Sequence, residues 1–270
     1  MTTLLRLWRL FAAGIWFQVA ALGALAVFPF GWGGIRRVGR FTRLWGAGLC
    51  RILGLQVRVC GEIPATPPRG LVVSNHLSYL DIIVHAGLFP VRFAPKAEIA
   101  RWPVVGWYLA LSRPVWVDRQ SRQKSARTMA EFAATLEHGI PLIVYPEGTS
   151  TNGKEGLLPF KSTPFEAVKT AGDIPIQPML IRYLEPLGRP PVCWYGDAAL
   201  LPHAWQVLGM RRIEVAVRFL PPVQPGGRDR KTLAADLHRL MDEAYREWTG
   251  SSAKPEGATG PELPSAAVPA

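Results

Sequence analysis

The stretch "LVVSNHLSYLD", residues 71–81, joins a short apolar run to a polar turn that carries a histidine and an aspartate. Apolar, β-branched residues bounded by Ser and Asn are typical of a buried strand that ends in a turn. If a helix follows, His76 lies at the strand end and Asp81 one helical turn further on. The carboxylate can then accept a hydrogen bond from the imidazole Nδ1–H and fix its tautomer, which leaves Nε2 free to take a proton from an alcohol. The stretch therefore predicts a strand–turn–helix unit with a general base in the turn.

The spacing of His76 and Asp81 alone does not show that the two residues form a catalytic pair. The pattern H-x4-D is short enough to arise by chance, and a helix N-terminus capped by Ser74 or Asn75 beside a hydrogen-bonded histidine uses the same residues. A zinc site is not expected, because the sequence has no H-E-x-x-H motif and no third ligand at a recognisable spacing. The remaining histidines are interpreted as structural, on helix faces, at a helix C-terminus or in a loop: His85, His238, His138 and His203.

Apolar runs of the same character recur beyond residue 62, and helical stretches separate them. The runs are "LVVSN" (71–75), "VRFAP" (91–95), "PVWVD" (114–118), "PLIVYP" (141–146), "IPIQPMLIRY" (174–183) and "IEVAVRFL" (213–220). The clearest helices extend from Ser121 to His138 and from Lys231 to Thr249, each followed by glycine. This alternation predicts an α/β domain, residues 62–249, with a mostly parallel or mixed sheet flanked by helices. Residues 250–270, rich in Pro, Gly, Ala and Ser, are expected to be disordered.

The first 61 residues contain eight arginines and no Asp or Glu. A net charge of +11 suggests an anionic partner, and the position of the charge indicates which kind. No residue between Arg9 and Arg36 is charged, and Leu10 to Phe30 would measure roughly 30 Å as a helix, enough to cross the hydrocarbon of a bilayer. We therefore expect an apolar, membrane-associated N-terminal helix. A cleavable signal peptide and a buried core helix are the alternatives.

A basic segment follows the uncharged run. In "IRRVGRFTRLWGAGLCRILGL", residues 35–55, arginines alternate with apolar residues at helical spacing. The pattern predicts either an amphipathic helix along an anionic interface, as the return leg of a helical hairpin, or an ordinary solvated helix face. Because this flank has more arginines than the first, the positive-inside rule places the following domain on the cytoplasmic side of the cell inner or plasma membrane. Nucleic acid is not expected as a partner, because the charge flanks an apolar span and does not line a groove with stacking aromatics. Residues 1–61 are thus predicted to be a membrane anchor and amphipathic segment.

The loop "YPEGTSTNGKE", residues 145–155, has two interpretations. From Gly148 it is one residue short of the phosphate-binding pattern G-x-x-x-x-G-K-[ST]. Glu155, however, stands where a hydroxyl would bind Mg²⁺, and the residues that follow are poor helix material, so a nucleotide site is disfavoured. The second interpretation is that Glu147, Gly148 and Thr149, just past an apolar strand, hydrogen-bond a polyol or a headgroup.

Two basic side chains stand near predicted strand or loop ends, Arg119 in "VWVDR" and Lys161 in "LPFKS". Either can pair with an anionic headgroup or stabilise charge on a reacting thioester. A single arginine or lysine is more often a surface charge, so these two residues alone do not define a site.

Four motifs in order resemble the glycerol-phosphate and lysophosphatidic-acid acyltransferase family, over residues 70–223. They are "NHLSYLD", "VWVDR", "YPEGTS" and "IPIQPMLI", and the resemblance rests on their order more than on any one of them. It implies His76 as general base and Asp81 as its orienting partner. The residues that it implies for binding of the acceptor are Asn75, Arg119, Glu147, Gly148, Thr149 and Lys161.

The resemblance also implies a reaction and its partners. The protein would be a membrane-bound O-acyltransferase of phospholipid or lipid biosynthesis that moves a fatty acyl group from acyl-CoA or acyl carrier protein to the hydroxyl of a lysolipid such as 1-acylglycerol-3-phosphate. His76 would take the hydroxyl proton while the oxygen attacks the thioester directly, without an acyl-enzyme. Backbone N–H groups near the His76 turn are expected to stabilise the oxyanion. No metal and no cofactor besides the acyl thioester is expected.

One departure from the family's pattern concerns the acceptor. The family's motif F-P-E-G-T-R-S has an arginine that is linked to a phosphate on the acceptor, whereas this chain has Ser150. A phosphorylated acceptor is therefore implied only if Lys154 or Lys161 takes over that role. The run "EGTSTNGKEGLLPFKS" and "WYGDAALLPHAW" (194–205) look more like relatives that acylate lyso-ornithine lipids or other lysophospholipids. The sequence is also compatible with a non-catalytic membrane lipid-binding protein and, more distantly, with a nucleotide-dependent enzyme.

Overall fold

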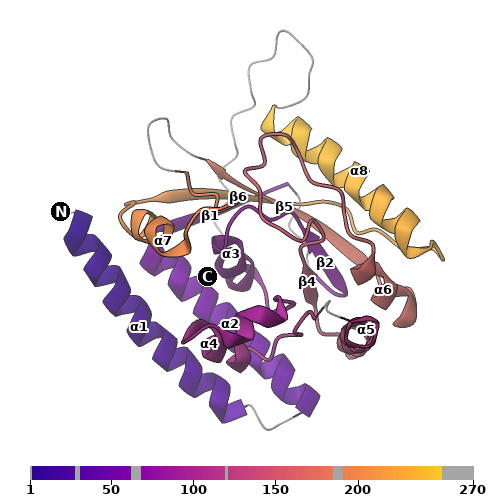
Figure 1. Cartoon of the computed structure of the whole chain (residues 1–270), viewed down its shortest axis with the longest axis horizontal. Coiled ribbons are helices and arrows are strands. Elements are labelled where there is room, and N and C mark those ends of the chain that lie inside the picture. Colours follow the sequence, from indigo (N-terminus) through magenta and orange to yellow (C-terminus); the bar gives the residue numbers. More distant parts are fainter. Residues whose placement is uncertain (1, 28–30, 62–67, 119–120, 185–190, 251–270) are drawn as a thin grey trace.

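A central sheet carries helices on both faces in the computed structural model, which describes residues 2–27, 31–61, 68–118, 121–184 and 191–250 (Figure 1). The strands are β1 (Leu55–Cys60), β2 (Leu71–Ser74), β3 (Arg92–Phe93), β4 (Leu142–Val144), β5 (Ile176–Leu184) and β6 (Ile213–Phe219). The α-helices are α1 (Thr2–Val27), α2 (Gly31–Leu53), α3 (Leu80–Leu88), α4 (Val105–Leu111), α5 (Arg122–Glu137), α6 (Glu166–Thr170), α7 (Leu200–Leu208) and α8 (Arg230–Thr249). Two short 3₁₀ helices are η1 (Ala97–Arg101) and η2 (Thr163–Phe165).

The sheet has six strands in the order β1-β6-β5-β2-β4-β3. Neighbouring strands are parallel except β5 and β6, which are antiparallel, so the predicted mixed α/β sheet is confirmed. Val73 of β2 is level with Val144 of β4 and Pro178 of β5. The carboxyl ends of these parallel strands therefore meet at one edge of the sheet, and the loops that follow β2 and β4 lie together there.

Two apolar clusters, one on each face, hold the helices to the sheet. The first receives side chains from α2, α3 and α7, and the second from α5, α6 and α8 (Figure 1). Successive strand residues point to opposite faces, so Val72 belongs to the first cluster while Leu71 and Val73 belong to the second. Burial on both faces explains why the central strands appear in the sequence as continuous apolar runs.

The two long helices of the predicted domain are confirmed, and their ends have clear causes. The Ser121 hydroxyl accepts a hydrogen bond from Lys124 N at the start of α5. At the start of α8, Asp229 accepts hydrogen bonds from Lys231 N and Thr232 N. These side chains satisfy N–H groups that have no partner within the helix. The predicted disordered tail lies outside the described residues, apart from the glycine that ends α8.

Two predicted features of the sheet differ from the structure. The strand predicted over 114–118 is wrong, because no named strand forms there. The segment lies beside the short edge strand β3, where Val115 N donates to Phe93 O and Val117 forms an isolated bridge with Lys96. The second difference is β1, which the sequence pattern groups with the amphipathic segment 1–61, whereas it pairs in parallel with β6 at the sheet edge. Gly54, with φ +75°, ends α2 and turns the chain into β1, so helix and strand follow each other without a loop. The division of the chain at residue 61 stays a prediction, but the first part contributes one strand to the sheet.

The helices α1 and α2 form the expected helical hairpin. Trp16 Nε1 donates to Trp45 O at 2.9 Å, and the ring of Phe17 meets that of Trp45 edge-on at 5.3 Å. On its other side α2 packs closely against α3, where a Cβ on Gly46 would lie only 2.5 Å from Gly87 N. The buried face of α2 is thus covered by protein, while its arginines are exposed: Arg36, Arg37, Arg40 and Arg43.

Helix α1 is long and apolar enough to cross a membrane, and 6% of its most apolar window is buried. It is nevertheless tied to the rest of the protein near its N-terminus. The Arg9 guanidinium donates to the carbonyl oxygens of Leu208, Met210 and Arg211, which join α7 to β6. The exposed apolar side chains of α1 are Leu4, Leu7, Trp8, Leu10, Phe11, Ile15, Val19, Leu22 and Leu25.

Candidate active site

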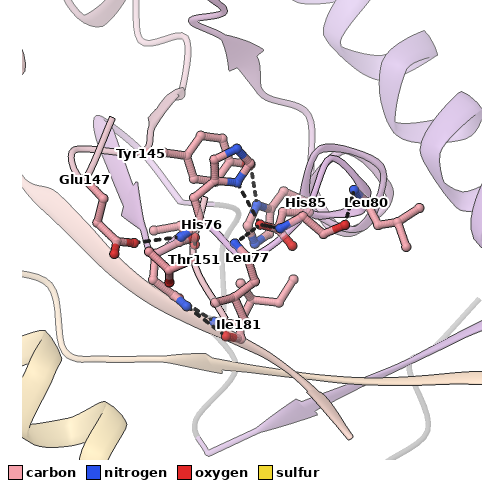
Figure 2. A network of polar contacts seen from close by, with 12 residues as sticks. His76, Leu77, Leu80, His85, Tyr145, Glu147, Thr151 and Ile181 are labelled. Atoms are coloured by element: carbon pink, nitrogen blue, oxygen red, sulfur yellow. Dashed lines mark hydrogen bonds and ion pairs between the residues drawn. The ribbon is translucent and has the colours of Figure 1, made fainter. Parts of the chain in front are cut away.

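The candidate site lies where the loops after β2 and β4 meet at the carboxyl edge of the sheet (Figure 2). Asn75, the residue after β2, is fully buried. Its Nδ2 donates to Ile181 O in β5 at 3.0 Å, and its Oδ1 accepts from Ile181 N at 2.8 Å. Its side chain therefore joins β2 to β5 just where the turn that carries His76 begins. The substrate-binding role expected of Asn75 stays a prediction, and the structure gives this residue a supporting contact instead.

His76 and Asp81 lie as the sequence predicts. Nδ1 of His76 is 2.8 Å from Oδ2 of Asp81, and 20% of the His76 side chain is exposed whereas that of Asp81 is fully buried. An ionised carboxylate only accepts hydrogen bonds, so Nδ1 carries the proton and Nε2 presents its lone pair. This arrangement can abstract a proton from a hydroxyl group placed against the exposed part of the imidazole.

Asp81 accepts four hydrogen bonds, from His76 Nδ1, Leu77 N, Ser78 N and the Tyr183 hydroxyl. Burial on its own would raise the pKa of this carboxyl, but the hydrogen bond and the charge of His76, together with the Tyr183 hydroxyl, hold the pKa below the ordinary value of 3.8. Asp81 is therefore ionised at neutral pH despite its burial. Its negative charge is available to stabilise the cation that forms when His76 accepts a proton.

Three N–H groups of the His76 turn are engaged with carboxylates. Those of Leu77 and Ser78 donate to Asp81, and that of His76 donates to Glu147 Oε1 at 2.9 Å. The expectation that N–H groups near this turn stabilise an oxyanion stays a prediction, and these three already have carboxylate partners.

Glu147 holds two loops together. It is buried, with 3% of its surface exposed, and one carboxylate oxygen faces the His76 turn (Figure 2). Its second oxygen accepts from Leu158 N at 2.9 Å. Burial raises the pKa of this carboxyl, although the hydrogen bonds from the backbone of Leu158 and His76 oppose the shift. Both oxygens point to backbone donors, so the structure shows Glu147 supporting the His76 turn. The acceptor-binding role expected of it stays a prediction.

Next to Glu147, the other residues of the E-G-T stretch face outward. Gly148 has φ +76°, a conformation that glycine adopts readily, and Thr149 is exposed. Lys161 lies across this turn, since a Cβ on Gly148 would be 2.3 Å from Lys161 Nζ. The structure therefore brings Gly148, Thr149 and Lys161 together on the solvent side of the loop. Arg119, the remaining predicted binding residue, lies outside the described residues.

Sequence reasoning missed two side chains beside the dyad, Tyr145, which contacts His76, and His85, which contacts Tyr145. The Tyr145 ring stacks on the His76 imidazole with centroids 4.3 Å apart, and its hydroxyl is 2.8 Å from Nδ1 of His85 (Figure 2). His85, interpreted from the sequence as a helix-face residue, is fully buried. The signal was present, because His85 follows Asp81 by four residues and residues at this spacing share one face of a helix. His203 does have a structural role, between Tyr79 and the carbonyl of Pro191.

The burial of His85 gives a testable dependence of stability on pH. Burial lowers its pKa from 6.5 to about 4, with the charge of Asp81 opposing and that of His76 adding to the shift. Below pH 6.5 the unfolded chain takes up a proton that the folded protein does not, so the free energy of unfolding falls as the pH is lowered to 4. We expect this histidine to account for about 3 kcal/mol of that loss. Urea unfolding of wild type and His85→Asn at several pH values measures this contribution of His85 to the free energy of unfolding. The variant keeps a polar group near the position of Nδ1 but has no group that titrates.

The pH window separates the titration of His85 from that of Asp81. Asp81 has a pKa below 3.8, so the stability that it contributes is lost only at more acidic pH. The difference in unfolding free energy between wild type and His85→Asn should therefore change mainly between pH 6.5 and 4. A difference that stays constant across this range would contradict the low pKa of His85.

Comparison with known proteins agrees with this geometry. Residues 56–182 match the acyltransferase domain family. A lyso-ornithine lipid O-acyltransferase of Brucella abortus is 35% identical over 207 residues, which cover 72% of this chain and 77% of that protein. The enzyme of the same name from Pseudomonas aeruginosa is 36% identical over 210 residues, covering 77% of each. The crystal structure of a 1-acyl-sn-glycerophosphate acyltransferase from Thermotoga maritima matches 94% of this chain and 98% of its own with a TM-score of 0.66 at 22% identity, which shows the same fold. The chain therefore belongs to the lysolipid O-acyltransferase family, and it is an acyltransferase.

Proposed function

We propose that the protein works at a membrane, where it transfers a fatty acyl group from acyl-CoA or acyl carrier protein to the free hydroxyl of a lyso-ornithine lipid. The observation that carries this proposal is the His76–Asp81 pair at 2.8 Å, with the carboxylate buried and the imidazole partly exposed. That pair is the machinery needed to activate a hydroxyl group, and membership of the lysolipid acyltransferase family supplies the class of acceptor.

The proposed reaction is a direct transfer. His76 Nε2 takes the proton of the acceptor hydroxyl as its oxygen attacks the thioester carbonyl carbon, and Asp81 stabilises the imidazolium. The tetrahedral intermediate then collapses with cleavage of the C–S bond, and the imidazolium returns the proton to the leaving thiolate. The products are the diacylated lipid and the free thiol of CoA or acyl carrier protein. The residues of this site need no further cofactor for these steps.

The choice of a lyso-ornithine lipid as acceptor rests on two observations. Ser150 stands where the family's motif has the arginine linked to a phosphate, and a headgroup built from ornithine carries no phosphate monoester. In addition, the Brucella and Pseudomonas relatives are both named for this acceptor. We further propose that Lys161, which lies against Gly148, receives the negative charge of the headgroup. The alternative acceptor is 1-acylglycerol-3-phosphate, which the Thermotoga enzyme's name specifies.

A panel of lysolipids tests the acceptor. Membranes that carry the full-length protein receive labelled acyl-CoA or acyl carrier protein together with lyso-ornithine lipid, 1-acylglycerol-3-phosphate or lysophosphatidylcholine. We expect lyso-ornithine lipid to be diacylated with the highest kcat/KM. A higher value for 1-acylglycerol-3-phosphate would overturn the choice of acceptor, and transfer to none of the three would favour a non-catalytic lipid-binding protein.

Replacing Lys161 should weaken acceptor binding without slowing the chemical step. We expect Lys161→Met to raise KM for lyso-ornithine lipid about tenfold, because a charge-assisted contact is lost, while kcat changes little. Lys154→Met is the matched control, since Lys154 is an exposed lysine of the same loop. Steady-state kinetics at saturating acyl thioester measure both variants. If Lys154→Met raises KM and Lys161→Met does not, the two lysines have been assigned in the wrong order.

The site of action is also part of the proposal. Exposed apolar side chains along α1 and exposed arginines on α2 support attachment of the hairpin to an anionic membrane. We place the catalytic domain on the cytoplasmic face of the inner or plasma membrane, as the arginine asymmetry around the apolar run favours. Protection of the domain from protease added to intact cells, and its cleavage after permeabilisation, checks this orientation. Cleavage in intact cells would contradict it.

A further inference from the structure

The imidazole of His76 rests on an aromatic ring. Tyr145 directly follows β4, and its ring stacks on the imidazole with centroids 4.3 Å apart and planes 24° from parallel (Figure 2). Asp81 contacts the imidazole at its edge, through Nδ1, so the tyrosine and the aspartate restrict different motions of the ring. An aromatic face also attracts a cation within about 6 Å of its centre. The same contact can therefore hold the base and stabilise its protonated form.

The Tyr145 ring is in turn held by His85. The tyrosine hydroxyl and His85 Nδ1 are 2.8 Å apart, and the two rings lie 25° from parallel. The second nitrogen of His85, Nε2, is buried with no hydrogen-bond partner among the residues that the structure describes. Burying an unpaired polar atom costs folding free energy that leucine or methionine at this position would avoid. Apolar packing thus does not explain a histidine here, whereas a partner for the tyrosine hydroxyl does.

The electrostatic environment suits a neutral partner. Burial keeps the pKa of His85 at about 4, so the side chain is uncharged at neutral pH. It therefore adds no positive charge beside His76 when that residue accepts a proton. A lysine or arginine in the same place would disfavour the imidazolium through like-charge repulsion.

We propose that Tyr145 and His85 are positioning residues for His76, the tyrosine ring supporting and stabilising the imidazolium and His85 fixing that ring through its hydroxyl. The family's motif has phenylalanine at the position of Tyr145, and phenylalanine can stack but cannot make this hydrogen bond. In this chain the tyrosine hydroxyl therefore adds to the stack a hydrogen bond with a buried histidine. The inference rests on the proposed acyl transfer, since it concerns the same general base.

Kinetics of single and double variants test the proposal. We expect Tyr145→Leu, which removes the ring, to lower kcat about thirtyfold while KM for the lysolipid stays within about twofold. Tyr145→Phe and His85→Leu each remove the same hydrogen bond and should each lower kcat about fivefold. The double variant Tyr145→Phe/His85→Leu should then lose no more than either single change. His85→Asn, which keeps a polar group near Nδ1, should restore most of the activity lost in His85→Leu.

Tyr79→Phe is the matched control. Tyr79 also shares a hydrogen bond with a histidine, His203, at 3.2 Å, but its ring does not stack on His76. We expect it to keep wild-type kcat. Equal kcat in wild type and folded Tyr145→Leu would overturn the proposal, as would losses that multiply in the double variant. If circular dichroism shows that Tyr145→Leu does not fold, the cycle of Tyr145→Phe, His85→Leu and their double variant tests the proposal instead. Absence of transfer by the wild type on every lysolipid would instead remove the proposed function, so the two failures are distinct.

Discussion

His76→Ala should lower kcat by about three orders of magnitude or more while the protein stays folded. A positioned general base contributes typically 10²–10⁴-fold, and Nε2 of His76 is the ring nitrogen that does not contact Asp81. The side chain is partly exposed, so its removal leaves no large buried cavity. Turnover of a labelled acyl thioester and lysolipid by purified protein in lipid vesicles measures the loss, and circular dichroism checks the fold.

A matched histidine outside the site serves as control for this experiment. His138, at the C-terminus of α5, bonds through Nδ1 to the carbonyl of Ala134 at 2.7 Å and makes no contact with the dyad. His138→Ala should keep kcat within about twofold of wild type. Wild-type turnover by folded His76→Ala would remove the proposed mechanism altogether, because no step of it proceeds without the imidazole.

Asp81→Asn should cost both activity and stability. The amide cannot accept hydrogen bonds on both of its polar atoms, so its NH₂ group faces either the Tyr183 hydroxyl or His76 Nδ1, and in the second case the imidazole takes the wrong tautomer. By analogy with the carboxylate of a catalytic triad, we expect kcat to fall about 10³–10⁴-fold. The buried donors left without a carboxylate should lower the free energy of unfolding by about 3 kcal/mol. Kinetics and urea unfolding measure the two effects.

A second aspartate, Asp236, provides a control that loses a carboxylate charge elsewhere in the protein. Asp236 pairs with Arg228 and Arg239 on the surface of α8, and Asp236→Asn should change neither quantity by much. Tyr183→Phe removes only the bond to Oδ1 of Asp81 and should give a smaller loss of stability than Asp81→Asn. The role of Asp81 would be refuted by an Asp81→Asn protein whose kcat lies within tenfold of wild type.

Local sequence patterns predicted the dyad and the layout of the domain. His76 and Asp81 are five residues apart in one strand–turn–helix unit, so their geometry depends on short-range structure that the sequence shows directly. The helices α5 and α8 have periodic apolar faces and capping residues, which is why their limits agree with the prediction within one residue at each end. The hairpin of α1 and α2 followed from an uncharged run and the arginine-rich segment after it.

The remaining features depend on contacts between distant segments. A carboxylate after a strand looks the same in the sequence whether it binds a ligand or a backbone, and only the fold shows that Glu147 receives the N–H groups of His76 and Leu158. The segment 114–118 has the composition of a strand, yet beside the two-residue strand β3 it makes only a few backbone hydrogen bonds and one isolated bridge. Conversely, β1 could not be told from the end of an amphipathic helix, because its role becomes visible only in its pairing with β6.

The hydrogen bonds on both sides of the His76 peptide determine how the turn moves. Its N–H donates to the buried carboxylate of Glu147 and its carbonyl accepts from Thr151 N, while the carbonyl of Leu77 accepts from Trp194 N. Most loops fluctuate independently of the core and exchange their amide hydrogens quickly. This one is tied to two other segments, the loop after β4 through Glu147 and Thr151 and the segment at Trp194. We therefore expect its amide hydrogens to exchange more slowly than those of most loops, because it opens only when these contacts break.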